Sequence, residues 1–137
     1  MAFTPRDYDS GKAKSLPLAA STTVTKFQHL KFSSGYLVDG ASGDNEAEYI
    51  ALETITDATA SDGGTSCKVL PLDGTVTFDA LTATTPVQAT HVGNDYDFSD
   101  LNTLDLTATT DKVFHIDSIV NATDKIVRGR FNKPALA

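Results

Sequence analysis

The most informative stretch of this chain is Cys67-Lys68-Val69-Leu70-Pro71-Leu72-Asp73-Gly74-Thr75-Val76-Thr77-Phe78-Asp79-Ala80, in which an Asp-Gly pair separates two alternating runs. An Asp-Gly pair suits a two-residue type I′ turn, because both central positions of that turn need a positive φ. The turn would set Val69 opposite Phe78 on an apolar face and Lys68 opposite Asp79 on the other face. The stretch therefore predicts a β-hairpin centred on Asp73-Gly74.

The rest of the chain continues this pattern of short strands and turns. Its 137 residues include 19 threonines, whose branched side chains suit a pleated surface. Apolar residues at helical spacing are not sustained anywhere. Turn signals recur at Ser34-Gly35, Asp39-Gly40, Asp62-Gly63-Gly64, Gly93-Asn94-Asp95 and Asn121-Ala122-Thr123-Asp124. The sequence therefore predicts a single all-β domain, built as a small barrel or as a sandwich.

A second hairpin is predicted over residues 112–132. Its two strands alternate apolar and polar residues around a four-residue loop. Two cross-strand pairs follow from that loop length: Phe114 with Phe131, and Asp117 with Arg128. Gly129 inside the second strand indicates a bulge or a close backbone approach.

The first 20 residues have neither a helical nor a strand period. They contain two prolines, mixed charges and isolated apolar residues. We expect an extended N-terminal arm over residues 1–20 and a β-domain over residues 21–137, although an ordinary frayed terminus would look the same. The arm would contact a partner through Phe3, Arg6, Tyr8, Leu16 and Leu18. Deleting residues 1–18 would then leave the β-domain folded and weaken its attachment.

Net charge separates the two ends of the chain from its middle. Residues 1–14 carry +1, residues 124–137 carry +3 and the segment between them carries −11, for a total of −7. An acidic body repels phosphate backbones, so nucleic acid is not the expected partner. The basic C-terminal end could contact an acidic protein surface, or it could be solvated charge that keeps the protein soluble.

No apolar stretch is long enough to span a bilayer, and the N-terminus lacks the apolar segment of a secretory signal. We therefore expect synthesis in a cytoplasm without export by that route, and no membrane partner. Cys67 is the only cysteine, which excludes an intramolecular disulfide. On the apolar face of the predicted hairpin its thiol should be buried and inert.

No catalytic or cofactor-binding pattern is present. His29, His91 and His115 lack the i, i+4 spacing of a helical zinc pair, so we expect structural or surface histidines. His115 falls on the less apolar face of its strand, near Arg130. The patterns Gly-x-Ser-x-Gly, Gly-x-Gly-x-x-Gly and the P-loop are absent. A nucleophile pair of Cys67 with His91 or His115 stays open, but we expect no enzyme, no cofactor and no resident metal.

Two acidic clusters are the candidates for a cation or a sugar. One contains Asp95, Asp97 and Asp100, and the other contains Asp39, Asp44, Asn45, Glu46 and Glu48. Oxygen-rich loops can hold Ca²⁺, but neither cluster has the ligand spacing, central Gly and closing Glu of the twelve-residue calcium loop. Alternation also places Tyr96 and Phe98 on the face opposite Asp95 and Asp97, as in a strand with one exposed side.

Four further segments follow one another in a distinctive order: Ser34-Gly35-Tyr36-Leu37-Val38, Glu48-Tyr49-Ile50-Ala51-Leu52, Val92-Gly93-Asn94-Asp95-Tyr96-Asp97 and Val127-Arg128-Gly129-Arg130-Phe131. Together with an acidic β-domain that is rich in Thr, Ala, Gly and Asp and is preceded by an extended arm, this order resembles the small capsid decoration (cement) proteins of tailed bacteriophages. The resemblance covers most of the chain and lies in composition and order, without an invariant motif.

This resemblance implies a β-barrel-like or β-tulip-like fold, often trimeric, on the outer capsid surface at three-fold or quasi-three-fold positions. There it would clamp neighbouring subunits of the major capsid protein after head expansion. The family brings no catalytic residues. We therefore expect a homotrimeric structural protein of a virion, made in the host cytoplasm and bound to the capsid exterior.

Two other classes of function fit the sequence. One is another virion component, such as a head-fibre base, a head–tail joining piece or a tail-tube protein, which would differ in symmetry. The other is a carbohydrate- or Ca²⁺-binding adhesion module, which would depend on the acidic clusters.

Overall fold

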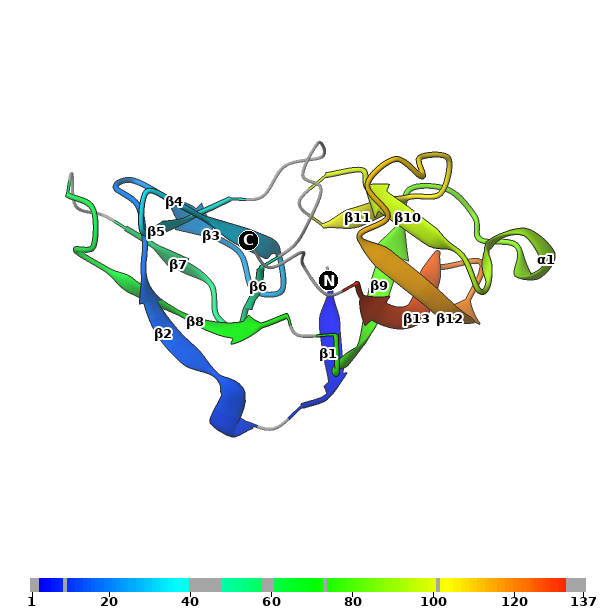
Figure 1. Cartoon of the computed structure of the whole chain (residues 1–137), viewed down its shortest axis with the longest axis horizontal. Coiled ribbons are helices and arrows are strands. Elements are labelled where there is room, and N and C mark those ends of the chain that lie inside the picture. The colour runs from blue at the N-terminus through cyan, green and yellow to red at the C-terminus, as the bar shows by residue number, and fades with distance from the viewer. Residues whose placement is uncertain are drawn as a thin grey trace.

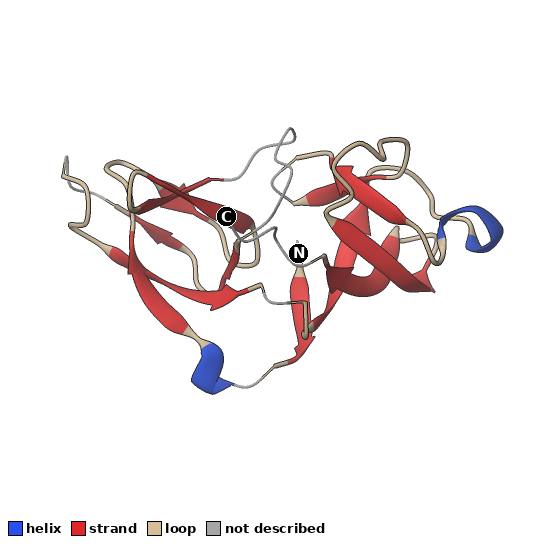
Figure 2. Cartoon of the chain, in the orientation of Figure 1, coloured by secondary structure: helices blue, strands red, loops and turns tan. Residues whose placement is uncertain are grey.

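The computed structural model describes residues 3–8, 10–39, 48–57, 61–72, 74–100 and 102–132. Strands make up nearly all of the regular structure, which confirms the predicted all-β fold (Figure 2). They are β1 (Thr4–Asp7), β2 (Lys14–Pro17), β3 (Thr23–Val24), β4 (His29–Ser33), β5 (Tyr36–Asp39), β6 (Tyr49–Ala51), β7 (Ile55–Thr56), β8 (Ser66–Pro71), β9 (Thr77–Thr82), β10 (Asp95–Phe98), β11 (Thr103–Asp105), β12 (Phe114–Asn121) and β13 (Ile126–Phe131). A 3₁₀ turn (Ser10–Lys12) and α1 (Gln88–His91) accompany them. Among the described residues, no helix is long and apolar enough to cross a membrane.

Five strands of the C-terminal half form a closed ring, which we call the barrel (Figure 1). β9 pairs with β11, β11 with β10, β10 with β12, β12 with β13, and β13 pairs back onto β9. The β9–β11 pairing is parallel and the other four are antiparallel. β1 adds a sixth strand, antiparallel to the first half of β9. Side chains alternate along each strand, so one face points into the barrel and the other faces outward.

The second sheet has the strand order β2-β8-β6-β4-β5. A bridge between Leu18 and Leu37 brings its two outer strands together, and the Ala19 amide donates to the Leu37 carbonyl oxygen at 2.9 Å. β3 and β7 form a separate two-stranded ribbon. Val24 and Ile55 of that ribbon pack into the core of the second sheet.

One hydrophobic cluster joins the barrel to the second sheet. Its centre is a set of phenylalanines whose ring centroids lie 5.0 to 6.2 Å apart: Phe3, Phe78, Phe98, Phe114 and Phe131. Ile50 and Leu70 of the second sheet belong to the same cluster. His29 of β4 stacks on Phe98 of β10, with a centroid distance of 3.6 Å and an interplanar angle of 3°. The two halves of the chain therefore share a core.

The predicted hairpin at Asp73-Gly74 is wrong. β8 pairs with β2 and β6 in the second sheet, whereas β9 pairs with β1, β11 and β13 in the barrel. The alternation along β9 suits β13 equally well, because it sets Asp79 opposite Arg128 and Ala80 opposite Val127. Gly74 does adopt a positive φ of 82°, while Asp73 lies outside the described residues. The segment connects two sheets instead of joining two neighbouring strands.

The second predicted hairpin is confirmed. β12 and β13 are antiparallel, with Phe114 opposite Phe131. A bulge after Ile116 inserts Asp117, so Ser118 faces Arg128 and the predicted Asp117–Arg128 pair is wrong by one residue. The close backbone approach predicted at Gly129 is confirmed, since an added Cβ would lie 1.8 Å from the His115 carbonyl oxygen.

The described part of the first 20 residues, 3–8 and 10–20, is not an extended arm. Residues 4–7 form β1 on the edge of β9, and residues 14–17 form β2 on the edge of β8. Phe3 and Leu18 are completely buried. A strand of four residues is too short to show a clear alternation of apolar and polar residues. Its burial also depends on strands that lie far along the chain.

Candidate functional site

The residues predicted to contact a partner divide into buried and exposed ones. Phe3 and Leu18 are core residues, which makes their assignment as partner contacts wrong for this fold. Leu16 is half-buried and packs against the core of the second sheet. Tyr8, just after β1, is 41% exposed, and the Arg6 side chain is 51% exposed. Arg6 and Tyr8 therefore remain available to a partner.

Arg6 shares a carboxylate with a second arginine. On the outward side of β9, Asp79 accepts hydrogen bonds from Nε of Arg128 at 2.8 Å and from its Nη2 at 3.3 Å. Nε of Arg6 lies 3.6 Å from Oδ2 of Asp79, the oxygen that also accepts the hydrogen bond from Nη2 of Arg128. The hydrogen bond to Asp79, and then the charge of its carboxylate, raise the pKa of the Arg128 guanidinium. Asp79 thus holds two arginines from opposite ends of the chain next to each other.

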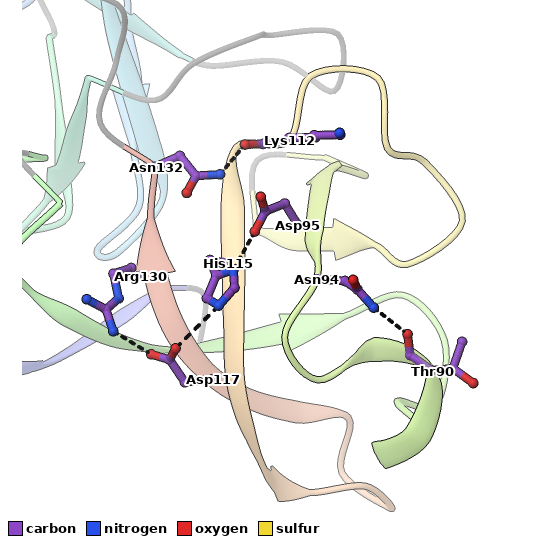
Figure 3. A network of polar contacts seen from close by, with 8 residues as sticks. All are labelled: Thr90, Asn94, Asp95, Lys112, His115, Asp117, Arg130 and Asn132. Carbon is purple, nitrogen blue, oxygen red and sulfur yellow. Dashed lines mark hydrogen bonds and ion pairs between the residues drawn. The ribbon is translucent and has the colours of Figure 1, made fainter.

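A second group of charges continues around the barrel onto β12 and β10 (Figure 3). Nδ1 of His115 lies 2.5 Å from a carboxylate oxygen of Asp95, and its Nε2 lies 3.6 Å from Asp117. The other oxygen of Asp117 accepts a hydrogen bond from Arg130 at 3.4 Å. We call the two groups together the charged belt: Arg6, Asp79, Arg128, Arg130, Asp117, His115 and Asp95.

The chemistry available to the charged belt is that of ion pairing. Each ring nitrogen of His115 is next to a carboxylate, so neither is directed at a hydroxyl or thiol that it could activate. The side chains of His115, Asp117 and Asp95 are each about one-third exposed. The belt therefore presents paired, solvated charges on the outer wall of the barrel.

A polar pocket of about 410 Å³ adjoins the acidic end of the belt. It is lined by Gly93, Asn94, Asp95, Tyr96, Thr109 and Lys112. Nδ2 of Asn94 donates to the Thr90 carbonyl oxygen at 2.8 Å, which fixes one wall (Figure 3). Tyr96 is buried in the core and offers no aromatic face to a sugar.

The acidic cluster around β10 stabilises turns. The Asp97 carboxylate accepts backbone N–H bonds from Thr110, Asp111 and Lys112 at 2.7 to 3.2 Å. Asp100 accepts from the amides of residues 102 and 103, and Asp105 from that of residue 107. The side-chain and then the backbone hydrogen bond from Thr107 lower the pKa of Asp105.

These hydrogen bonds direct the carboxylates at amides instead of at a shared cation. Within the described ranges, no three His, Cys, Asp or Glu side chains are grouped to hold a metal. Tyr96 and Phe98 face the core, as predicted, but the exposed side predicted for this strand is wrong for Asp97, which is buried. Of the second acidic cluster, residues 44–46 lie outside the described part of the chain.

The remaining candidate nucleophile is buried. Cys67 is inaccessible to solvent, as predicted. Burial, and to a smaller degree the charge of Glu53, raise the pKa of its thiol to about 11. His29 is enclosed in the core, and Nδ1 of His91 accepts a hydrogen bond from the Val87 amide at 2.8 Å. Both histidines therefore have structural positions, as expected.

The comparisons with family models, curated proteins and solved structures find no match to this chain. The predicted proximity of His115 to Arg130 is confirmed by the register of β12 and β13. The contact of His115 with Asp95, and the sharing of Asp79 by Arg6 and Arg128, could not be predicted from the sequence. Alternation along β13 does set Arg128 and Arg130 on one face of that strand. It does not show which carboxylates they meet, because the strands that pair with β13 or lie near it include ones far away in the sequence.

Proposed function

We propose that this protein is a non-enzymatic structural component of a bacteriophage particle, which decorates the capsid exterior by binding the major capsid protein. The observation that carries the proposal is the charged belt. On the outer wall of the barrel it presents three partly exposed arginines, a residue type enriched in protein interfaces, and ion pairs hold them in place. A homotrimer bound at capsid three-fold positions is the form that the sequence resemblance favours.

The fold supports attachment to a large assembly. Both edges of β9 carry paired strands, and closure of the ring leaves few unpaired strand edges in the described part of the barrel. A decoration protein needs only modest affinity per copy, because the contact is repeated many times over a symmetric shell. Partly exposed arginines and a tyrosine are suitable groups for such a contact.

Co-sedimentation with phage heads tests this proposal. The purified protein is mixed with unexpanded and with expanded heads of the phage that encodes it, and bound copies per head are counted. Binding to expanded heads, with a raised temperature of head disruption, is the expected result. Binding to isolated tails instead would favour a tail component, and no binding to heads or tails would contradict a virion role.

Light scattering tests the expected symmetry separately. A stable mass of three chains supports the three-fold position, whereas a six-fold ring would favour a head–tail joining or tail-tube protein. The adhesion module is the alternative from another class, and the pocket beside Asp95 is the observation in its favour. It predicts that Ca²⁺ or a glycan raises the melting temperature of the protein.

A further inference from the structure

The two basic ends of the chain meet on opposite edges of β9. β1 carries Arg6 and pairs with one edge, while β13 carries Arg128 and Arg130 and pairs with the other (Figure 1). Neighbouring strands lie about 4.8 Å apart, so β1 and β13 are separated by about 10 Å. Folding therefore collects on one face the arginines that the sequence distributes to its two ends.

Guanidinium groups form the outermost layer of this face. The side chains of Arg6, Arg128 and Arg130 are 51%, 38% and 56% exposed, whereas Asp79 beneath them is 10% exposed. Two of these arginines share the single carboxylate of Asp79, so within this described group the positive charges outnumber the negative one. Arg130 is held by Asp117 at the longer distance of 3.4 Å. We call Arg6, Arg128 and Arg130 the arginine surface.

The geometry of this surface favours carboxylate ligands. Arg128 uses Nε and one Nη to bind Asp79, so its other N–H groups remain for a second acceptor. A guanidinium binds carboxylates through two parallel hydrogen bonds, and its fixation by Asp79 lowers the entropy lost on binding. Tyr8, exposed at the end of β1, adds an aromatic group of the kind enriched in protein interfaces.

The charge of the whole chain decides between two kinds of anionic partner. A net charge of −7 opposes a long polyanion such as nucleic acid, which would face the acidic body as well as the arginines. A small group of carboxylates on a folded protein can contact the three arginines without extending over the rest of the acidic body. We infer that the arginine surface is the face through which this protein binds a carboxylate-rich surface of another protein. The inference rests on the proposed function and adds to it the contact face and the chemistry of the partner.

A pair of double variants tests the inference. Arg6→Gln/Arg130→Gln removes two charges from the arginine surface and keeps Arg128 with Asp79. Lys14→Gln/Lys68→Gln removes two charges from exposed positions of β2 and β8 in the second sheet and is the matched control. Binding of a short fluorescent poly-glutamate peptide, which spans only the arginine surface, and of a single-stranded oligonucleotide is measured at low and physiological salt. Thermal melting of each variant verifies that it is folded.

The arginine variant should bind poly-glutamate about tenfold more weakly than the parent, because it loses two exposed ion pairs. The control should retain the parent's affinity, and the parent should prefer poly-glutamate to the oligonucleotide. Equal loss in both variants, or a preference for the oligonucleotide, would overturn the inference. So would a concentration-dependent increase in mass that Arg6→Gln/Arg130→Gln abolishes, since the partner would then be a second copy of this chain.

The same variants on phage heads separate this inference from the proposed function. If the parent binds heads and only the arginine variant fails to bind, both stand. If all three proteins bind heads equally, the capsid role stands and the arginine surface is not its contact. If no protein binds heads but poly-glutamate discriminates between the variants, the inference stands and the capsid is not the partner.

Discussion

Gly129 lies where the backbones of β13 and β12 approach each other closely. A Cβ at this position would be 1.8 Å from the His115 carbonyl oxygen and 2.8 Å from the Phe114 ring. The obstruction is backbone, which cannot rotate away as a side chain can. At the scale of single residues, the fold therefore requires glycine at position 129, although glycine has no side chain that could take part in binding or catalysis.

Gly129→Ala should lower the free energy of unfolding by about 3 kcal/mol or more, because β12 and β13 must separate to admit the methyl group. Gly93→Ala is the matched control: Gly93 has a φ of +87° but nothing within 4 Å of an added Cβ. The control should cost only about 1 kcal/mol, from the left-handed backbone alone. Urea denaturation measures both, and equal losses would show that the close approach at Gly129 is not tight.

Cys67 permits a prediction on reactivity and pH. With its pKa raised to about 11, the thiol stays protonated and should react with a thiol reagent at pH 8 far more slowly in the native than in the urea-unfolded protein. Because the folded state holds this proton more tightly, the contribution to stability is fully present below the ordinary pKa of 9.0 and is lost as the pH rises towards 11. Cys67→Ala should remove that part of the alkaline decline. Rapid labelling of the native protein would contradict the buried position.

At the scale of elements, β1 and β2 bind the N-terminus into both sheets. β1 lies on the barrel through β9, and β2 lies on the second sheet through β8. Phe3 contacts the rings of Phe98, Phe114 and Phe131. The N-terminal residues therefore belong to the core that joins the two sheets.

Phe3→Ala should lower the free energy of unfolding by about 4 kcal/mol, the usual cost of removing a fully buried phenylalanine. For a domain of this size that corresponds to a fall in melting temperature of roughly 10 °C or more. Tyr8→Ala, at an exposed aromatic of the same segment, should change stability by less than about 0.5 kcal/mol. Deletion of residues 1–18 should prevent folding, and a deletion variant that melts like the parent would restore the view of these residues as an arm.

At the scale of the whole molecule, the shared hydrophobic cluster couples the barrel to the second sheet. Ile50 and Leu70 of the second sheet pack with the phenylalanines of the barrel, and His29 stacks across the same junction. Neither half can lose its structure without exposing apolar surface of the other.

The chain should therefore unfold in one cooperative step. Calorimetry should give a single transition whose calorimetric and van't Hoff enthalpies agree. Val24→Ala in the second core cluster and Val127→Ala in the barrel should both lower the temperature of that one transition. Two separable transitions, each sensitive to only one of these substitutions, would show that the halves are independent.

Local patterns in the sequence were sufficient for several features. Threonine content and recurring turn residues predict the all-β fold, and the alternation of residues 112–132 predicts the β12–β13 hairpin with Phe114 opposite Phe131. A single glycine in a strand predicts the close approach at Gly129. These features depend on contacts between residues near one another in sequence, where propensity and register leave few alternatives.

Only the tertiary structure determines which strands pair when they are far apart in the sequence. By local alternation alone, Asp79 could lie opposite Lys68 in a hairpin or opposite Arg128 in the barrel. The pattern therefore could not decide whether the Asp73-Gly74 segment joins two neighbouring strands or connects the two sheets. The pairing of β1 and β13 with β9 brings Arg6 to Arg128 and makes the arginine surface, which neither end of the chain encodes by itself. The physical reason is that burial of the phenylalanine cluster selects among strand pairings, and that gain exists only when the whole chain is folded.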